Sequence, residues 1–184
     1  HIGYHAGLHV LVASTACGSE ASAEVLRTDT CSSKSFENVY VVDSQNLSTG
    51  SGHVVYDAAL MAKDGIEPKE ICRRLETMIP KVDASFVIDR LDYLHKGGRC
   101  SGLEAVGAKL LRIKPCIEVI DGKMQVGKKY RGSFESCVEH YVRDRLLNRE
   151  EIDSSRVFIT HSMCSAQVVA KVREIIRSYA YFDE

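Results

Sequence analysis

The sequence predicts an α/β protein, with a parallel sheet in a first lobe and a β-hairpin in a second α/β lobe. Short apolar runs bounded by polar residues alternate with segments whose apolar residues repeat at helical spacing, which is the pattern of βα units. A hairpin signal after residue 114 interrupts this alternation. The 184 residues are 45% hydrophobic and 27% charged, which is typical of a globular chain that can bury a core.

The expected elements follow from these runs in chain order. Strands are expected where the apolar runs are short and rich in β-branched residues, at residues 8–13, 39–42, 85–88 and 157–160. Helices are expected where the spacing is helical, at residues 19–27, 52–64, 68–79, 134–147 and 166–179. Pro68 suits the first position of its helix, where the missing N–H costs no hydrogen bond.

Residues 115–130 carry the hairpin signal. Alternating residues on either side of Asp121-Gly122 predict two antiparallel strands joined by a type I′ turn. We therefore divide the chain into a first lobe at 1–80, a second lobe with the hairpin at 81–150, and a strand and helix at 151–184 that return towards the second lobe.

Composition narrows the class of partner. The net charge of −1 gives no general attraction to nucleic acid, and no apolar run approaches the roughly 20 residues that span a bilayer. The cysteines are seven, an odd number, and most lie in apolar or helical contexts, which favours reduced thiols in the cytoplasm. No Cys-x-x-Cys pair occurs, which argues against a zinc ribbon or a thioredoxin-like site. His1, His5 and His9 would share one face of a helix, but Gly3 and Gly7 interrupt it, so no metal site is expected.

Two loops at expected strand ends are candidates for ligand binding. Ser14 and Ser19, with Gly18, lie in a loop that leads from a strand into a helix and can offer hydroxyls and N–H groups to an anion. The alternative is a plain helix cap by Ser14 or Ser19. The second loop begins at Asp43-Ser44, where Asp43 orients a hydroxyl or simply caps a turn.

The second loop continues through Ser48 and Thr49, which are candidate caps of the next helix, to Gly50 and Gly52, which allow a close loop. His161 follows the last expected strand. It is a candidate base, although the sequence places no nucleophile beside it.

A third feature is the Gly-Gly-Arg sequence that ends at Arg99. A short helix with Leu91 and Leu94 inward would end at Gly97-Gly98, which holds Arg99 on a turn. By itself this arrangement fits an arginine that caps helix carbonyls or pairs with a neighbouring carboxylate.

Several motifs in one order resemble those of the DegV family of bacterial fatty-acid-binding proteins. Residues 91–99 match its Leu-x-Tyr-Leu-x-Lys-Gly-Gly-Arg motif, and Lys-Pro at 114–115, Asp-Gly-Lys at 121–123 and Arg-Gly at 131–132 follow in the family's order. Asp43-Ser44 and the glycines at 50 and 52 match an earlier signature. Residues 13–19 align with a Ser-Ser-x-Leu-Ser-Gly-Thr loop, although Ala13 and Cys17 replace hydroxyl residues. The family's terminal motifs do not occur, so the chain is expected to be the central part of such a protein.

The resemblance implies a DegV-like fold and a carrier without catalytic residues or cofactor. Ser14, Gly18 and Ser19 would bind the carboxylate of a long-chain fatty acid, with Asp43 and Ser44 in the neighbouring loop. Arg99 would dock a fatty acid kinase that phosphorylates the bound acid. The alternatives are a hydrolase or transferase that uses a Ser/Thr loop with His161, and a regulatory module without ligand.

Overall fold

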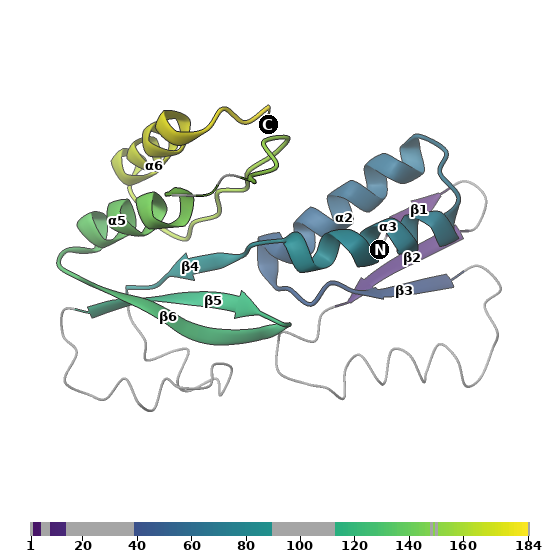
Figure 1. Cartoon of the computed structure of the whole chain (residues 1–184), viewed down its shortest axis with the longest axis horizontal. Helices are drawn as coiled ribbons and strands as arrows, with labels where there is room; N and C mark the ends of the chain where they lie inside the picture. The colour runs from purple at the N-terminus through teal and green to yellow at the C-terminus, as the bar shows by residue number, and fades with distance from the viewer. Residues whose placement is uncertain are drawn as a thin grey trace.

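The computed structural model describes residues 39–89, 113–147, 149 and 151–183, together with the backbone of the strands at 2–4 and 8–13. Two three-stranded sheets lie side by side, each with helices over one face (Figure 1). The α/β class expected from the sequence is confirmed. The helix expected at 19–27 lies outside the described residues.

The first sheet has the order β1-β2-β3 and is mixed. β2 (Leu8–Ala13) and β3 (Val39–Asp43) pair in parallel, as expected of two strands joined by a crossover. β1 (Ile2–Tyr4), which the sequence reading missed, pairs antiparallel to β2. Since residues 8–13 form a strand, His9 does not lie on a helix.

α2 (Ser48–Lys63) and α3 (Pro68–Met78) pack over this sheet, and the 3-10 turn η1 (Ile79–Lys81) follows. Buried apolar side chains from β3, both helices and η1 form one core: Val42, Val54, Ala58, Ile71, Leu75 and Ile79. α2 begins four residues before the expected start at 52. The sequence suggested that Gly50 and Gly52 lie in a loop, but both lie inside the first turns of this helix.

The second sheet is antiparallel in the order β4-β5-β6, formed by β4 (Ser85–Val87), β5 (Ile113–Ile120) and β6 (Lys123–Arg131). Asp121 and Gly122 have φ values of 50° and 72°, so the expected type I′ hairpin is confirmed. A register shift between Pro115 and Ile117 interrupts the ladder of β5 with β6.

α5 (Phe134–Leu146) packs on the second sheet, and α6 (Ala166–Tyr179) packs on α5. Both helices were expected, and each starts at a serine whose hydroxyl accepts a hydrogen bond from a backbone N–H three residues on, Ser133 from Ser136 and Ser165 from Val168. Their core contains Val142, Val172, Ile175 and Ile176.

The expected strand at 157–160 is wrong, because no described strand pairs with these residues. Their apolar character has another cause: Val157 and Ile159 pack against the core between α5 and α6. Each sheet lies within one of the two lobes that the sequence predicts, at residues 1–80 and 81–150, and α6 packs back on α5 of the second lobe. The lobe boundaries themselves stay a prediction.

Candidate functional site

The carboxyl ends of β2 and β3 meet at one edge of the first sheet. Ala13 and Asp43, the last residues of the two strands, are register partners in the parallel ladder. The segments that follow both strands therefore leave from the same edge. Ser14, Gly18 and Ser19 belong to the first of these segments and lie outside the described residues, whereas Asp43 and Ser44 are described.

The segment after β3 is a polar turn closed by its own side chains. Asp43 Oδ1 accepts a hydrogen bond from the backbone N–H of Gln45 at 3.0 Å, so this carboxylate caps a turn. The hydroxyl of Ser44 is fully buried, lies 2.9 Å from the hydroxyl of Ser51, and accepts from the N–H of Asn46 at 3.3 Å. The Ser44 side chain therefore points into the turn and stabilises its conformation.

Asn46 is the central residue of this loop, and the sequence reading missed it. The side chain is 3% exposed. Its Oδ1 accepts from the Leu47 N–H at 3.1 Å, and its Nδ2 donates to the carbonyl of Val82 at 3.4 Å. Val82 lies between η1 and β4, so Asn46 ties the loop to the segment that enters the second sheet. No pattern in the sequence marks this 36-residue separation.

Gly50 makes room for the Asn46 amide. A Cβ on Gly50 would lie 1.9 Å from Asn46 Oδ1 and 2.4 Å from Asn46 Cγ, which no packed structure tolerates. Gly52, the second glycine of the pair, has nothing within 4 Å of the same position. The two glycines therefore have different functions in the fold, although the sequence presents them alike.

The N-terminus of α2 opens at this loop without a side-chain cap. Leu47 is the N-cap residue, so the expected capping by Ser48 or Thr49 is wrong. Ser48 has a φ of 47°, which places the start of the helix next to a left-handed turn. A helix end that no side chain caps keeps the positive end of the peptide dipole available for an anion.

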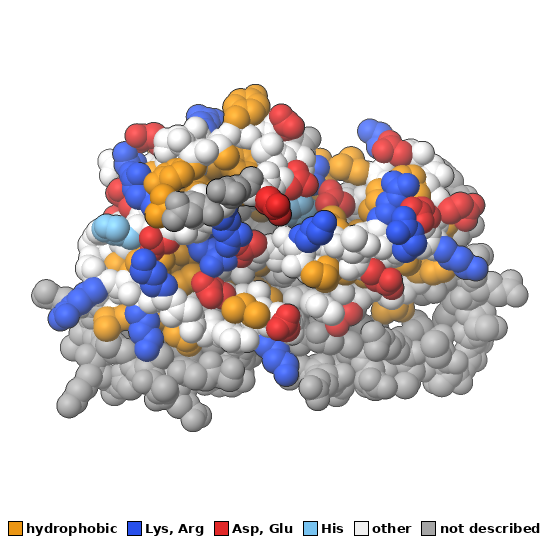
Figure 2. Space-filling view, viewed as in Figure 1, with side chains coloured by type: hydrophobic (Ala, Val, Ile, Leu, Met, Phe, Trp, Pro, Cys, Tyr) orange, Lys and Arg blue, Asp and Glu red, His pale blue; other side chains and the backbone are white. Residues whose placement is uncertain are grey.

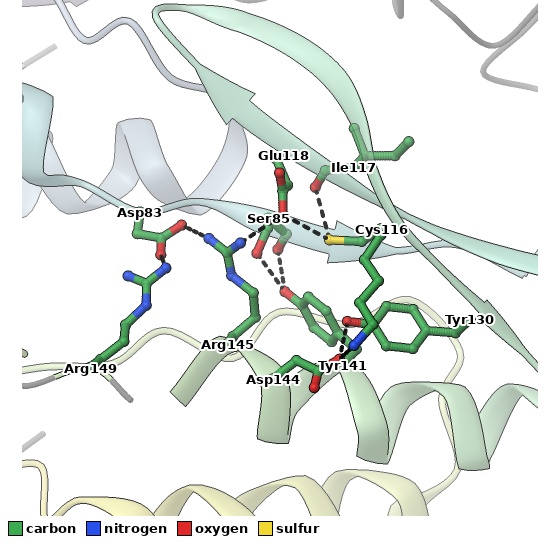
Figure 3. Close-up of polar contacts among 11 residues, drawn as sticks. Asp83, Ser85, Cys116, Ile117, Glu118, Tyr130, Tyr141, Asp144, Arg145 and Arg149 are labelled. Carbon is green, nitrogen blue, oxygen red and sulfur yellow. Dashed lines mark hydrogen bonds and ion pairs between the residues drawn. The ribbon is translucent and has the colours of Figure 1, made fainter. Parts of the chain in front are cut away.

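A second polar cluster joins α5 to the second sheet (Figure 3). The Arg145 guanidinium forms an ion pair with Asp83, which precedes β4, and donates to Glu118 Oε1 of β5 at 2.7 Å. Arg149 also pairs with Asp83. Gly127 of β6 leaves space for the Glu118 carboxyl group, since a Cβ there would lie 2.5 Å from Glu118 Cδ. The cluster connects three separate segments of the chain.

Two tyrosines and a cysteine lie beside these ion pairs. The Tyr141 hydroxyl donates to the Ser85 carbonyl at 2.9 Å, and burial raises the pKa of Tyr141 to about 12. Burial, together with the Glu118 carboxylate, raises the pKa of the Cys116 thiol to about 11. The Tyr130 hydroxyl donates to Asp144 at 2.9 Å. These groups stay protonated near neutral pH, so the cluster fits a packing role better than nucleophilic chemistry.

The opposite face of the second sheet is apolar near the hairpin turn and carries Lys129 and Arg131 at the far end of β6. Cys116 packs with Tyr130 and Cys137 on the α5 side, so the residues before and after it on β5 face the other way. Strand alternation and the cross-strand register place six apolar side chains on that second face: Phe86, Pro115, Ile117, Val119, Met124 and Val126. Ile117 is 0% exposed.

His161, the candidate base, is exposed, and none of the described side chains hydrogen-bonds to its imidazole. Within the same residues, no group of three or more His, Cys, Asp or Glu side chains is placed to hold a metal ion. The described cysteines, Cys72, Cys116, Cys137 and Cys164, are free thiols.

None of the helices in the described parts is long and apolar enough to cross a bilayer. Acidic and basic side chains are interspersed over the described part of the face in Figure 2, in keeping with the net charge of −1.

Fold and site together define a two-sheet α/β protein with a polar turn after β3 at one sheet edge and an apolar face on the other sheet. The chain belongs to the DegV family, because the family model described as an uncharacterised protein of the DegV family matches residues 2–181. A DegV domain-containing protein of Clostridium acetobutylicum is 36% identical over 117 residues, which are 62% of this chain and 42% of that protein.

A further relative is named a fatty acid-binding protein, from Thermotoga maritima. It is 28% identical over 148 residues, which are 79% of this chain and 51% of the relative. The chain thus spans about half the length of the curated relatives that it matches.

Solved structures share the fold. A DegV family protein of Ruminococcus gnavus with vaccenic acid aligns with a TM-score of 0.74 at 21% identity, covering 94% of this chain and 62% of that one. A DegV family protein of Eubacterium eligens loaded with heptadecanoic acid aligns with a TM-score of 0.71 at 19% identity, covering 95% and 63%. Both support the arrangement of the two sheets.

Proposed function

We propose that the chain belongs to a cytoplasmic fatty-acid-binding protein, which buries an acyl chain and presents the carboxylate to a fatty acid kinase without catalysing a reaction itself. The observation that carries this proposal is the pairing of Ala13 with Asp43, because it brings the polar segments that follow β2 and β3 to one edge of a sheet. Relatives named or solved as fatty-acid binders support the ligand class.

The head group would lie at this edge. The hydroxyls of Ser14 and Ser19 and the backbone at Gly18 would donate to the carboxylate, next to the uncapped start of α2. Asp43 and Ser44 would act as neighbours that shape the second loop, because their oxygens already accept the Gln45 and Asn46 N–H groups.

The acyl chain would use apolar surface of the second lobe. On the apolar face of the second sheet, the half-buried side chains of Phe86, Val119 and Val126 offer such surface within the same molecule. Each methylene removed from water contributes about 0.8 kcal/mol, so a long chain binds tightly with few polar contacts. Selectivity for acyl length would follow from the extent of this surface.

The purified chain should release a fatty acid on solvent extraction, detected by mass spectrometry. In binding assays, Ser14→Ala and Ser19→Ala should each weaken heptadecanoic acid by about tenfold to a hundredfold, because one hydrogen bond to a charged carboxylate is worth roughly 1.5–3 kcal/mol. Heptadecanol should lose much less affinity, since it lacks the charge. Calorimetric titration with both ligands measures the difference.

Thr77→Ala serves as the control, because its hydroxyl donates to Arg73 O on the exposed side of α3. It should leave both affinities unchanged. An equal loss for the acid and the alcohol in the serine variants would contradict a carboxylate site at this loop, as would a chain that binds neither ligand.

Arg99→Ala should lower the rate at which a fatty acid kinase phosphorylates the bound acid, while the acid itself stays bound. The physical reason is that a planar guanidinium suits protein interfaces and phosphate neighbourhoods. A coupled assay with kinase and ATP, run beside a lipid-binding titration, separates the two effects. Loss of lipid or of folded protein in this variant would instead favour the cap or ion-pair interpretation of Arg99.

A further inference from the structure

Residues 156–159 form a short two-sided segment between the lobes, which we call the strap. Val157 and Ile159 pack on the core between α5 and α6. Arg156 and Phe158 instead contact residues of α2 in the first lobe. The alternation of neighbouring side chains thus anchors the strap to one lobe and presents every second residue to the other.

Arg156 makes the strongest of these contacts. Its Nη1 donates to Asp57 Oδ1 at 2.8 Å, and its guanidinium carbon lies 4.2 Å from the centre of the Tyr56 ring. The Arg156 side chain is only 10% exposed and that of Asp57 23%. An ion pair so shielded from water, with a cation over an aromatic face, is a stronger link than a surface pair.

Phe158 extends the contact along α2. Its ring lies edge-on, 5.2 Å from the His53 ring and 6.4 Å from the Tyr56 ring. His53 Nε2 in turn lies 3.6 Å from Asp57 Oδ2, one helical turn away. His53, Tyr56 and Asp57 therefore form one stripe of α2 that the strap contacts.

α2 connects the strap to the candidate head-group edge. The helix starts at Ser48, directly after the turn that Asn46 and Gly50 hold together. The segment between α5 and α6 runs on the side of the second lobe that faces α2 (Figure 1). A helix moves as a rigid element, so a contact at Asp57 fixes the position of the turn at its start.

We propose that Arg156 is a positioning residue: by pairing with Asp57 it holds α2, and with it the polar edge at Asp43 and Asn46, against the second lobe, and so slows the release of the bound ligand. The inference rests on the proposed fatty-acid binding. In this proposal the strap controls the release of a ligand whose carboxylate lies at an edge of the first lobe and whose acyl chain lies on an apolar face of the second lobe.

The first test needs no ligand. Hydrogen exchange followed by mass spectrometry should show amides of α2 (residues 48–63) exchanging at least about fivefold faster in Arg156→Ala than in the parent chain, because a coupling between elements is typically worth that factor or more. Arg73→Ala is the matched control, since Arg73 pairs with Glu70 on its own helix and its side chain is 67% exposed. The control should leave exchange in α2 unchanged.

The second test uses heptadecanoic acid as the probe. The dissociation rate, followed by transfer to albumin, should rise at least about fivefold in Arg156→Ala and in Asp57→Asn, and the double variant should be no faster than either single one. Arg156→Lys keeps the charge but loses the planar contact with Tyr56, so its rate should lie between those of the parent and Arg156→Ala.

The outcomes separate the two ideas. A chain that binds no heptadecanoic acid overturns the proposed function, while faster exchange in α2 still supports the inter-lobe contact. Unchanged exchange in α2 of Arg156→Ala overturns the strap itself. Faster exchange with an unchanged dissociation rate, or additive effects of the two single variants on that rate, overturns the control of ligand release.

Discussion

Gly50→Ala should destabilise the chain by about 3 kcal/mol or more and abolish measurable binding of fatty acid. The new Cβ would overlap Asn46 Oδ1, so Asn46 must move and lose its bonds to the Leu47 N–H and the Val82 carbonyl. Overpacking costs about 1–3 kcal/mol, and the loss of hydrogen bonds from a buried amide adds about 1–3 kcal/mol. Urea unfolding and a fatty acid titration measure the two effects.

Gly52→Ala is the matched control for this prediction. The same change two residues later meets no atom within 4 Å, and it replaces a poor helix former inside α2. It should stabilise the chain by about 0.5–1 kcal/mol and leave binding intact. Equal behaviour of the two glycine variants would contradict the close contact between Gly50 and Asn46.

Arg145→Ala should lower the free energy of unfolding by about 3 kcal/mol. Arg145 is 24% exposed and Glu118 is 23% exposed, so removing the guanidinium takes the basic partner away from the poorly solvated Glu118 carboxylate, whereas Asp83 keeps its ion pair with Arg149 (Figure 3). Removal of one partner from a buried pair costs about 3–5 kcal/mol, and the partial exposure here favours the lower end. The melting temperature should fall by about 6–12 °C in a calorimetric scan.

Exposed Arg143, on the same helix, provides the control. Arg143→Ala has the same change in helix propensity without removing the ion pairs to β5 and to the segment before β4, and should change stability by less than about 0.5 kcal/mol. Arg145→Lys should recover part of the loss, because an ammonium keeps the charge but cannot contact two carboxylates in one plane. Similar melting temperatures for the two alanine variants would show that the cluster contributes nothing to stability.

Much of the fold could be read from local patterns. The helix at Ala166–Tyr179 was expected at the same residues, because its apolar spacing lies within one short segment. The strand at Leu8–Ala13 followed from an apolar run bounded by small residues. The run at 157–160 is also apolar and forms no strand, because Val157 and Ile159 pack against the core between α5 and α6 instead.

The site was only partly accessible from the sequence. Asp43 and Ser44 were correctly placed at the end of a strand, since strand ends are marked by the change from apolar to polar residues. The inward orientation of Ser44 and the importance of Asn46 were not foreseen, because both depend on contacts that form only when α2 folds back on the loop.

The sequence alone determined the elements whose geometry is local. Asp121-Gly122 requires a left-handed turn, and the periodicity of α6 requires a helix, in any context that keeps these segments together. Only the tertiary structure decided which distant groups meet. Arg145 pairs with Asp83 across 62 positions, and Arg156 reaches Asp57 across 99. Backbone preference acts over a few residues, whereas ion pairs and buried amides depend on how whole helices and sheets pack.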